Sequence, residues 1–336
     1  MKTVLLVGPW VGEFGWELMA WQGWLRAITE RKKFHRIIVL NTPGKESMYA
    51  LPNSVYEDIV LPEVSGDASC YGRLFNKGED AAAFYTWCRD KIQEVKEKAE
   101  NEDATHVEIL MPNYQNPYWC PTFWPYQKFI SYRVKSATIY SKPTVAFVIR
   151  KRSFCSERNL DQSWWDSLAS LLTKGGVEVL ECPHTFEEAR WVLSSVDLAI
   201  GGSTGGIHLA SLCECPIYVW GVPFSIYGPW EISDKQRHEI AWNPLGAPLI
   251  ETLNNVEGWK PKVDKVYGRV MFALEDIGRR AANLEKNKKL WQFKVWLPGR
   301  LRLMLGQFLF EVQNRKNRRL GSKLLEIIAP SKIERQ

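Results

Sequence analysis

The chain has 336 residues, 45% hydrophobic and 24% charged, a composition typical of a folded globular protein and not of a disordered or fibrous one. Its seven cysteines have no framework spacing, which indicates free thiols in a reducing compartment. The net charge of +6 is uneven, because residues 281–336 hold 13 Lys and Arg against 4 Glu, leaving about −3 for the preceding 280 residues. No run of about 18 apolar residues occurs and Gly8-Pro9 interrupts the first apolar run, so the sequence predicts no membrane span or signal peptide and indicates a cytoplasmic protein.

Strand-like and helix-like runs alternate in the first third of the chain. Short apolar runs ended by turn residues predict buried parallel strands, and apolar residues at helical spacing predict amphipathic helices. The expected elements are a strand at Thr3–Gly8, a helix at Glu17–Lys32, a strand at Arg36–Asn41, a helix at Asp80–Ala99 and a strand at His106–Leu110.

The pattern changes between residues 111 and 140, which are crowded with Pro and aromatic residues, and the alternation restarts at Pro143. Ser163 is the expected N-cap of the first helix there. The sequence thus predicts an α/β protein of two Rossmann-like doubly wound domains at 1–140 and 141–280, with a basic amphipathic helical tail at 281–336. The second domain is expected to have strands at Thr144–Arg150, Val177–Cys182, Asp197–Gly202 and Pro216–Gly221, and helices at Ser163–Gly176, Thr185–Val196 and Gly206–Leu212.

The run GGSTGG at 201–206 joins an expected strand directly to an expected helix. Glycines let backbone N–H groups approach a ligand, and a helix N-terminus carries partial positive charge, so this turn favours a phosphate or diphosphate. Thr204 adds a hydroxyl, and His208 lies one turn into the helix, where it can face the same ligand. A tight connection with no ligand is the alternative, and neither a Walker loop nor the G-x-G-x-x-G spacing is present.

The segment from Ser203 to Leu209, with the following ASL and CPIYVWGVP runs, resembles the donor-binding signature of the ADP-heptose:lipopolysaccharide heptosyltransferases. In that family an Asp-Thr-Gly-x-x-His-Leu run precedes an apolar strand and a Gly-x-Pro turn. The resemblance implies the two-domain glycosyltransferase-B fold and places Ser203, Thr204, Gly205 and His208 at the donor diphosphate. This sequence departs from the family at Ser203, where the family has Asp.

Two acids near the N-terminus, Glu13 and Glu17, follow the first expected strand within VGEFGWEL. Laid against the same family, Glu17 falls where the proposed general base stands, and Glu13 remains its rival because the loop has an extra residue. A carboxylate there would deprotonate an acceptor hydroxyl as it attacks the anomeric carbon of the sugar. The alternative is that either acid only caps the following helix.

A basic run, RKRSFCSERN, follows the strand expected at 144–150. Because ligands bind beyond the carboxyl ends of parallel strands, Arg150 or Arg152 is predicted to neutralise the leaving nucleoside diphosphate; the alternative is a solvated loop. Glu187 lies in a loop region that often meets the nucleoside in glycosyltransferase-B proteins, or else is only an acid at a helix start. No Asp-x-Asp metal motif is evident, so we expect neither a metal nor a cofactor besides the nucleotide-sugar substrate.

Aromatic and basic residues mix in the segment 290–320. Such an amphipathic pattern favours contact with anionic lipid at the inner face of the membrane; packing on the first domain and binding of nucleic acid are the alternatives. We therefore expect a metal-independent glycosyltransferase that transfers a sugar to a hydroxyl of a lipopolysaccharide or cell-surface glycan precursor. The alternatives are a glycosyltransferase acting on modified DNA bases and a non-catalytic glycan- or partner-binding protein.

Overall fold

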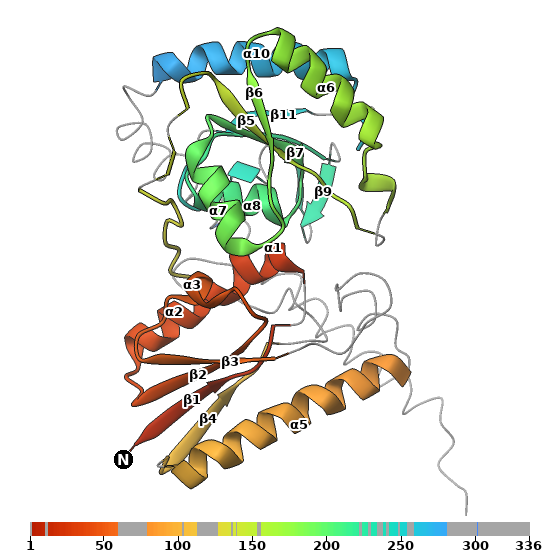
Figure 1. Cartoon of the computed structure of the whole chain (residues 1–336). Coiled ribbons are helices and arrows are strands. Elements are labelled where there is room, and N and C mark those ends of the chain that lie inside the picture. The colour runs from red at the N-terminus through yellow and green to blue at the C-terminus, as the bar shows by residue number, and fades with distance from the viewer. Residues whose placement is uncertain are drawn as a thin grey trace, which may run out of the picture.

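The structure of the chain is a computed structural model that contains two parallel β-sheets, one from each half of the chain (Figure 1). Helices pack on both sides of each sheet, so the predicted α/β class with two doubly wound units is confirmed. The exact domain boundaries stay a prediction. The structure describes residues 2–10, 13–59, 79–102, 104–112, 127–135, 137–138, 140–152, 156–221, 224–227, 230–233, 238–239, 242–247, 249–253, 259–280 and 301.

The first sheet has four strands in the order β3-β2-β1-β4, all parallel. Its helices supply the crossovers that parallel strands require. The strands are β1 (Thr3–Val7), β2 (Arg36–Asn41), β3 (Ser54–Asp58) and β4 (His106–Leu110). The helices are α1 (Phe14–Trp16), the π-helix η1 (Glu17–Trp21), α2 (Gln22–Arg31), α3 (Glu46–Tyr49) and α5 (Glu79–Glu102).

Alternate residues of β1 point to opposite faces of the first sheet and are buried in different cores. Val4 and Leu6 face α5, where they pack against Ile92 and Val95. Leu5 and Val7 face the other way, toward a second core that contains Leu18, Trp21 and Leu25 of η1 and α2. The apolar run TVLLV is therefore a strand covered on both faces, as a parallel sheet demands.

The second sheet has five parallel strands in the order β11-β8-β7-β5-β6, and the strands β9 and β10 form a separate antiparallel pair. The strands are β5 (Thr144–Val148), β6 (Glu178–Glu181), β7 (Leu198–Gly202), β8 (Ile217–Trp220), β9 (Phe224–Tyr227), β10 (Trp230–Ser233) and β11 (Leu249–Leu253). The helices are α6 (Gln162–Lys174), α7 (Phe186–Ser195), α8 (Gly205–Leu212) and α10 (Val263–Arg280), with a 3-10 turn at Ser156–Arg158.

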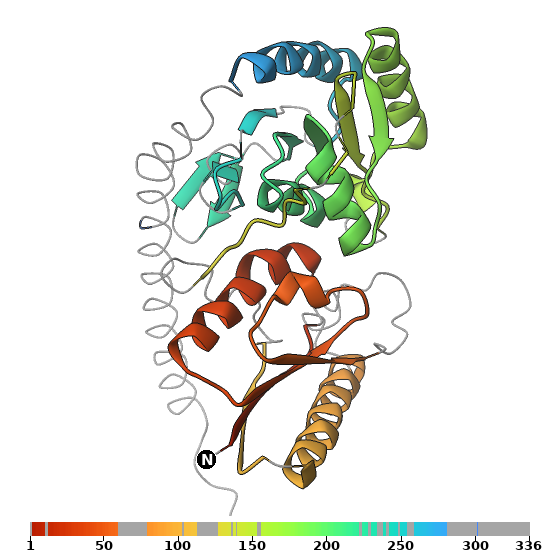
Figure 2. The ribbon, with the colours of Figure 1, turned by 60° about the vertical axis from the view of Figure 1, so that its left-hand side comes forward.

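The two units meet through helices, with α1 and α2 of the first unit facing α7 and α8 of the second (Figures 1 and 2). Helices α6 and α10 lie on the far side of the second sheet, and α5 lies on the far side of the first. One continuous apolar cluster crosses the contact, containing Leu18 and Trp21 from the first unit and Ile207 and Leu212 from the second. The contact is therefore a packed interface, and any chemistry between the units occurs beside it.

Several expected boundaries differ from the observed ones, and three helix starts have a clear physical reason. The first helical stretch begins at Phe14, not Glu17, because Glu13 takes the extended conformation of an N-cap and its carbonyl accepts the amides of Trp16 and Glu17. Helix α6 begins at Gln162, since the carbonyl of Asp161 already accepts the amide of Trp164, so Ser163 is not its N-cap. Helix α8 begins at Gly205, one residue before the expected start.

Gly201 in β7 lies where a side chain has no room, which predicts a large loss of stability for Gly201→Ala. A Cβ there would meet the carbonyl oxygen of Val148 at 2.8 Å and its Cβ at 3.1 Å. Overpacking of this kind costs about 1–3 kcal/mol, so thermal unfolding should show a lower Tm. The matched control is Gly268→Ala in α10, where an added methyl meets nothing within 4 Å and should raise stability by roughly 0.5–1 kcal/mol. A Gly201→Ala protein as stable as wild type would contradict the packing described for β5 and β7.

Candidate active site

The strand order of each sheet marks one place where a ligand site forms. Open parallel sheets bind ligands beyond the carboxyl ends of the strands, at the point where the strand order reverses. In the second sheet this point lies between β5 and β7, and in the first between β1 and β4. The loops that follow β5 and β7 contain the predicted residues Arg150 and Ser203, and the loop after β1 leads to Glu13.

The turn from β7 to α8 has the features of an anion site. Thr204 is the N-cap of α8 with an extended backbone, yet its side chain makes no capping hydrogen bond. Its Oγ1 is buried and has no hydrogen-bond partner within the described part of the chain. The first amides of a helix also lack partners inside the helix, so this hydroxyl and the first amides are donors available to one anion.

Ser203 is held by its neighbours on three sides. Its amide donates to the carbonyl of Trp220 at 2.8 Å, its Oγ lies 3.1 Å from Nε2 of His238, and its carbonyl accepts a hydrogen bond from Arg158. Arg158 in turn stacks its guanidinium over the ring of Trp259, 4.2 Å from the ring centroid. These contacts fix the turn that presents Thr204.

His208 lies on the side of α8 that faces the first unit. Its ring is 8% exposed and stacks on Trp242 with ring centroids 4.6 Å apart. A Cβ added to Gly15 of α1 would lie 2.7 Å from its Nδ1, and one added to Gly205 would lie 2.9 Å from the amide nitrogen of Gly15. The two helices therefore touch through a pair of glycines, and α1 lies directly against the start of α8.

The residues of the basic run point in different directions. Arg150 Nη1 donates to the side-chain oxygen of Asn159 and, at 3.3 Å, to the carbonyl of Arg152, so it holds its own loop together. Lys151 turns outward and pairs with Glu181 at 2.7 Å, with both side chains about half exposed. Arg152 instead crosses to the first unit.

Glu13 is the partner of Arg152 across the two units. Its Oε1 lies 3.1 Å from Nη1 of Arg152, and the two side chains are 25% and 33% exposed. Glu13 is the N-cap residue of α1, but its side chain makes no capping hydrogen bond to the helix, and its role as a base stays a prediction. A partly exposed carboxylate thus lies between the units, on the helix that touches the start of α8.

Glu17 is placed quite differently from Glu13. It is 2% exposed and begins the π-helix η1, a type of segment that is frequent at functional sites. Its Oε2 lies 2.6 Å from Nζ of Lys45, and its Oε1 accepts a hydrogen bond of 2.7 Å from the hydroxyl of Tyr49. Both carboxylate oxygens are therefore occupied by buried or partly buried donors.

Glu187 lies in the first turn of α7, after the N-cap Thr185. Its carboxylate accepts a hydrogen bond from Ser47 of α3 and lies 3.4 Å from Nη1 of Arg190. Arg190 also donates to the hydroxyl of Ser47 at 3.1 Å. Glu187 therefore joins the two units through α3, and its predicted contact with the nucleoside stays a prediction.

Four residues near this interface were missed by reasoning from the sequence, namely Lys45, Tyr49, His238 and Trp242. Lys45 follows Pro43-Gly44, a turn signal that indicates a loop beside a strand end, but nothing in the local pattern pairs it with Glu17. His238 and Trp242 follow the last predicted strand and have no periodic pattern. Only tertiary packing brings them to His208 and Ser203.

The predicted free thiols are confirmed for the four cysteines that the structure describes, Cys88, Cys182, Cys213 and Cys215, all of them buried. Burial raises the pKa of the Cys182 and Cys213 thiols to about 12, so both are protonated at neutral pH and unreactive. No group of three or more His, Cys, Asp or Glu side chains in the described ranges is arranged to hold a metal ion.

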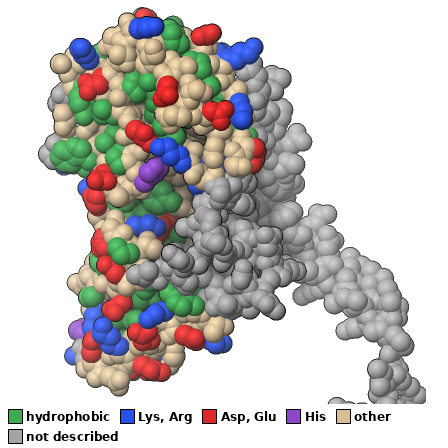
Figure 3. Space-filling view, turned by 45° about the vertical axis from the view of Figure 1, so that its right-hand side comes forward, with side chains coloured by type: hydrophobic (Ala, Val, Ile, Leu, Met, Phe, Trp, Pro, Cys, Tyr) green, Lys and Arg blue, Asp and Glu red, His purple; other side chains and the backbone are tan. Residues whose placement is uncertain are grey.

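The predicted membrane contact through 290–320 lies outside the described residues, apart from the exposed Leu301. No helix among those described is long and apolar enough to cross a bilayer. On the face drawn in Figure 3, acidic and basic side chains are interspersed over both units.

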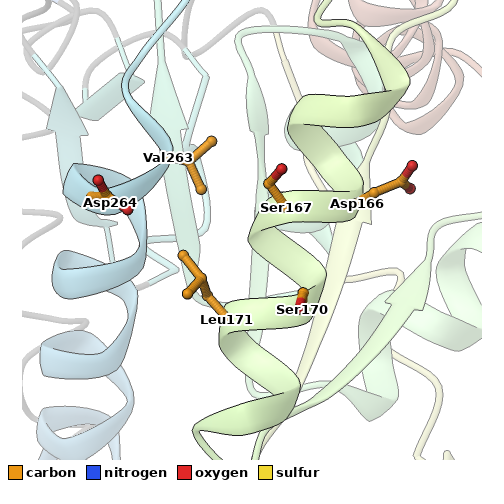
Figure 4. Close-up of a pocket in the computed structure, with 6 residues that line it drawn as sticks. All are labelled: Asp166, Ser167, Ser170, Leu171, Val263 and Asp264. Atoms are coloured by element: carbon orange, nitrogen blue, oxygen red, sulfur yellow. The ribbon is translucent and has the colours of Figure 1, made fainter.

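A separate depression lies between α6 and α10, on the side of the second sheet away from the first unit (Figures 1 and 4). It is lined by Asp166, Ser167, Ser170, Leu171, Val263 and Asp264. Its charged residues are acidic, so it is unsuited to a phosphate group.

No protein-family model matches the sequence, and a comparison with curated protein sequences gives no match. Among solved structures, the chain is similar to a glycosyl transferase of family 9 from Veillonella parvula, with 11% identity over 82% of this chain and 98% of that one and a TM-score of 0.46. It is also similar to the E. coli heptosyltransferase WaaC with ADP (13% identity, 66% and 88% covered, TM-score 0.34). A third similar structure is the spinosyn rhamnosyltransferase SpnG, with 13% identity over 90% of this chain and 99% of that one and a TM-score of 0.39.

Proposed function

We propose that the protein is a glycosyltransferase that moves a sugar from a nucleoside diphosphate-sugar to a hydroxyl group of an acceptor. The observation that carries the proposal is the ion pair between Glu13 and Arg152, which joins the two units beside the start of α8. It puts a base, a cation and an anion-binding helix terminus at one interface. These are the groups that such a transfer needs.

The diphosphate of the donor binds at the start of α8 in this proposal. The hydroxyl of Thr204 and the first amides of the helix donate to it, and the positive end of the helix dipole attracts it. Arg152 adds a full positive charge, and its five N–H donors allow contact with both Glu13 and a phosphate oxygen. Ser203, held by Arg158 and His238, positions this turn, and its predicted contact with the diphosphate stays a prediction.

The reaction follows from these placements. Glu13 accepts the proton of the acceptor hydroxyl while the oxygen attacks the anomeric carbon of the sugar. The bond between that carbon and the diphosphate oxygen breaks, and its electron pair stays on the diphosphate. Arg152 and the α8 terminus stabilise the charge that develops on the leaving group, the task that a metal ion performs in other transferases. We assign the base to Glu13 because Glu17 is buried with both oxygens occupied.

A lipopolysaccharide or other cell-surface glycan precursor is the acceptor class that we propose. Its support is the sequence resemblance of the segment from Ser203 to Leu209 to the heptosyltransferase signature. A cytoplasmic location at the inner face of the membrane is part of the same proposal.

The donor site is tested by thermal unfolding of the full chain with the diphosphates of adenosine, uridine, guanosine, cytidine and thymidine. We expect one nucleotide to raise the Tm, since saturating a site at 100 times its Kd adds about 2.7 kcal/mol of stability. Thr204→Val should lower the affinity for that nucleotide roughly 10- to 100-fold, because a hydrogen bond to a charged group is worth about 1.5–3 kcal/mol.

The matched control is Thr185→Val at the start of α7. Both threonines are N-caps without a side-chain bond to the helix backbone, but the hydroxyl of Thr185 also donates to Glu188 at 2.6 Å. Thr185→Val therefore perturbs its helix at least as much as Thr204→Val does. Thr185→Val should leave nucleotide binding unchanged. The proposed donor site is wrong if no nucleoside diphosphate shifts the Tm, or if both variants lower the affinity for the nucleotide equally.

A further inference from the structure

The buried carboxylate of Glu17 is part of a cluster that includes helix α3. Lys45 precedes the helix and pairs with Oε2, while Tyr49 ends the helix and donates to Oε1. Tyr49 is 1% exposed, and Lys45 keeps 24% of its side chain exposed. One side chain of η1 therefore holds both ends of α3.

The hydroxyl of Tyr49 keeps its proton at neutral pH. Burial, and after it the charge of Glu17, raises the pKa of the Tyr49 phenol well above its ordinary value. At neutral pH the phenol is therefore available as the donor to Glu17. The carbonyls of Met48 and Tyr49 both accept hydrogen bonds from Nη1 of Arg26, at 3.0 and 2.9 Å, so the end of α3 is held from α2 as well.

Helix α3 and Lys45 connect this cluster to the second unit through two sets of contacts. Ser47 in the middle of α3 bonds to Arg190 and Glu187 of α7. The ammonium of Lys45 lies 5.7 Å from the ring centroid of Phe14, a cation–π distance. The rings of Phe14 and Phe186 pack edge to face, with their centroids 6.4 Å apart. A Cβ added to Gly205 would lie 2.9 Å from Cδ1 of Phe14.

We propose that Glu17 is a positioning residue: by fixing Lys45 and Tyr49 it holds α3 and Phe14 against α7 and the start of α8. The carboxylate acts through these neighbours and touches no substrate. Its loss would loosen the contact between the two units and with it the donor site. The kinetic consequences rest on the proposed function, whereas the structural consequence does not.

The test is Glu17→Gln in the full chain, which keeps the shape of the side chain and removes its charge. We expect small-angle X-ray scattering to give a larger radius of gyration than wild type. We also expect the KM for the donor to rise about tenfold while kcat stays within about threefold and the pH–rate profile keeps its shape. The matched control is Glu94→Gln, which removes the exposed Lys91–Glu94 pair of the same length, 2.6 Å, on the outer helix α5.

Two results would overturn the proposal. A fall in kcat of a hundredfold or more with an unchanged KM and an altered pH–rate profile would make Glu17 the base instead. A radius of gyration equal to that of wild type and of Glu94→Gln would show that Glu17 does not hold the units together. The radius of gyration tests the structural role of Glu17 even if the protein transfers no sugar. Failure of the proposed function is therefore distinguished from failure of this inference.

A second variant keeps the test decisive if Glu17→Gln does not fold. Glu17→Gln combined with Lys45→Met removes both charges, so no unpaired charge is left buried. The double variant should show the same increase in the radius of gyration. Retention of the wild-type value by the folded double variant would contradict the proposal.

Discussion

The Glu13→Gln protein is expected to transfer sugar about a thousandfold more slowly than wild type, because a positioned general base contributes about 10²–10⁴-fold. Gln has the same size and keeps an oxygen that can accept a hydrogen bond from Arg152, which lies 3.1 Å from the Glu13 carboxylate. The affinity for the nucleoside diphosphate should therefore change little. Steady-state kinetics with the nucleotide-sugar and titration calorimetry with the nucleotide measure the two effects separately.

The control for Glu13→Gln is Glu181→Gln. Glu181 also pairs with a cation of the basic run, Lys151, but both of these side chains are about half exposed and neither contacts Arg152 in the pair described. Its replacement should leave kcat unchanged. A Glu13→Gln protein with wild-type kcat would contradict the assignment of the base and return Glu17 to that role.

Arg152→Met is expected to lower kcat by about a hundredfold or more, since removal of one group that stabilises developing negative charge typically costs 10²–10³ in rate. Methionine keeps much of the length of the side chain but supplies neither charge nor hydrogen-bond donors. The adjacent Lys151→Met variant, which removes a cation that faces Glu181, should change kcat by less than about twofold. Steady-state kinetics of both variants under identical conditions provide the measurement.

Equal effects of Arg152→Met and Lys151→Met would mean that only the overall positive charge of the loop matters. A large effect of Lys151→Met alone would contradict the orientation of the loop. Thermal unfolding of both proteins separates a loss of rate from a loss of folding.

The strands that pack on both faces could be predicted closely from the sequence. The strand expected at Arg36–Asn41 has the observed bounds, and those expected at Thr3–Gly8 and Asp197–Gly202 differ by one residue. Their apolar runs end at turn residues, and burial on both faces leaves few other ways to place them. The glycine-rich turn before α8 could be recognised for a related reason, since only small residues fit there.

The strand β3 and the helix α3 could not be predicted in the same way. β3 lies at the edge of its sheet and is half polar, SVYED, so it lacks a buried run. α3 has only four residues, too few to show a helical period, and its place depends on contacts with Glu17 and Arg26 that are distant in the sequence.

The two acids of the opening stretch illustrate the same limit. Glu13 and Glu17 are four residues apart and look alike in sequence, yet Glu13 is partly exposed between the units and Glu17 is buried. The difference arises because the helix begins at Phe14, which puts Glu17 inside the first turns and leaves Glu13 ahead of them. No local pattern around either acid distinguishes the two.

The most direct test of the account is hydrogen–deuterium exchange of the full chain with and without the nucleoside diphosphate that raises its Tm. We predict slower exchange of the amides from Gly205 to His208, at the start of α8, and no change in α6, whose residues line the acidic depression of Figure 4. Protection confined to α6 and α10, or none at the start of α8, would contradict the placement of the donor between the two units.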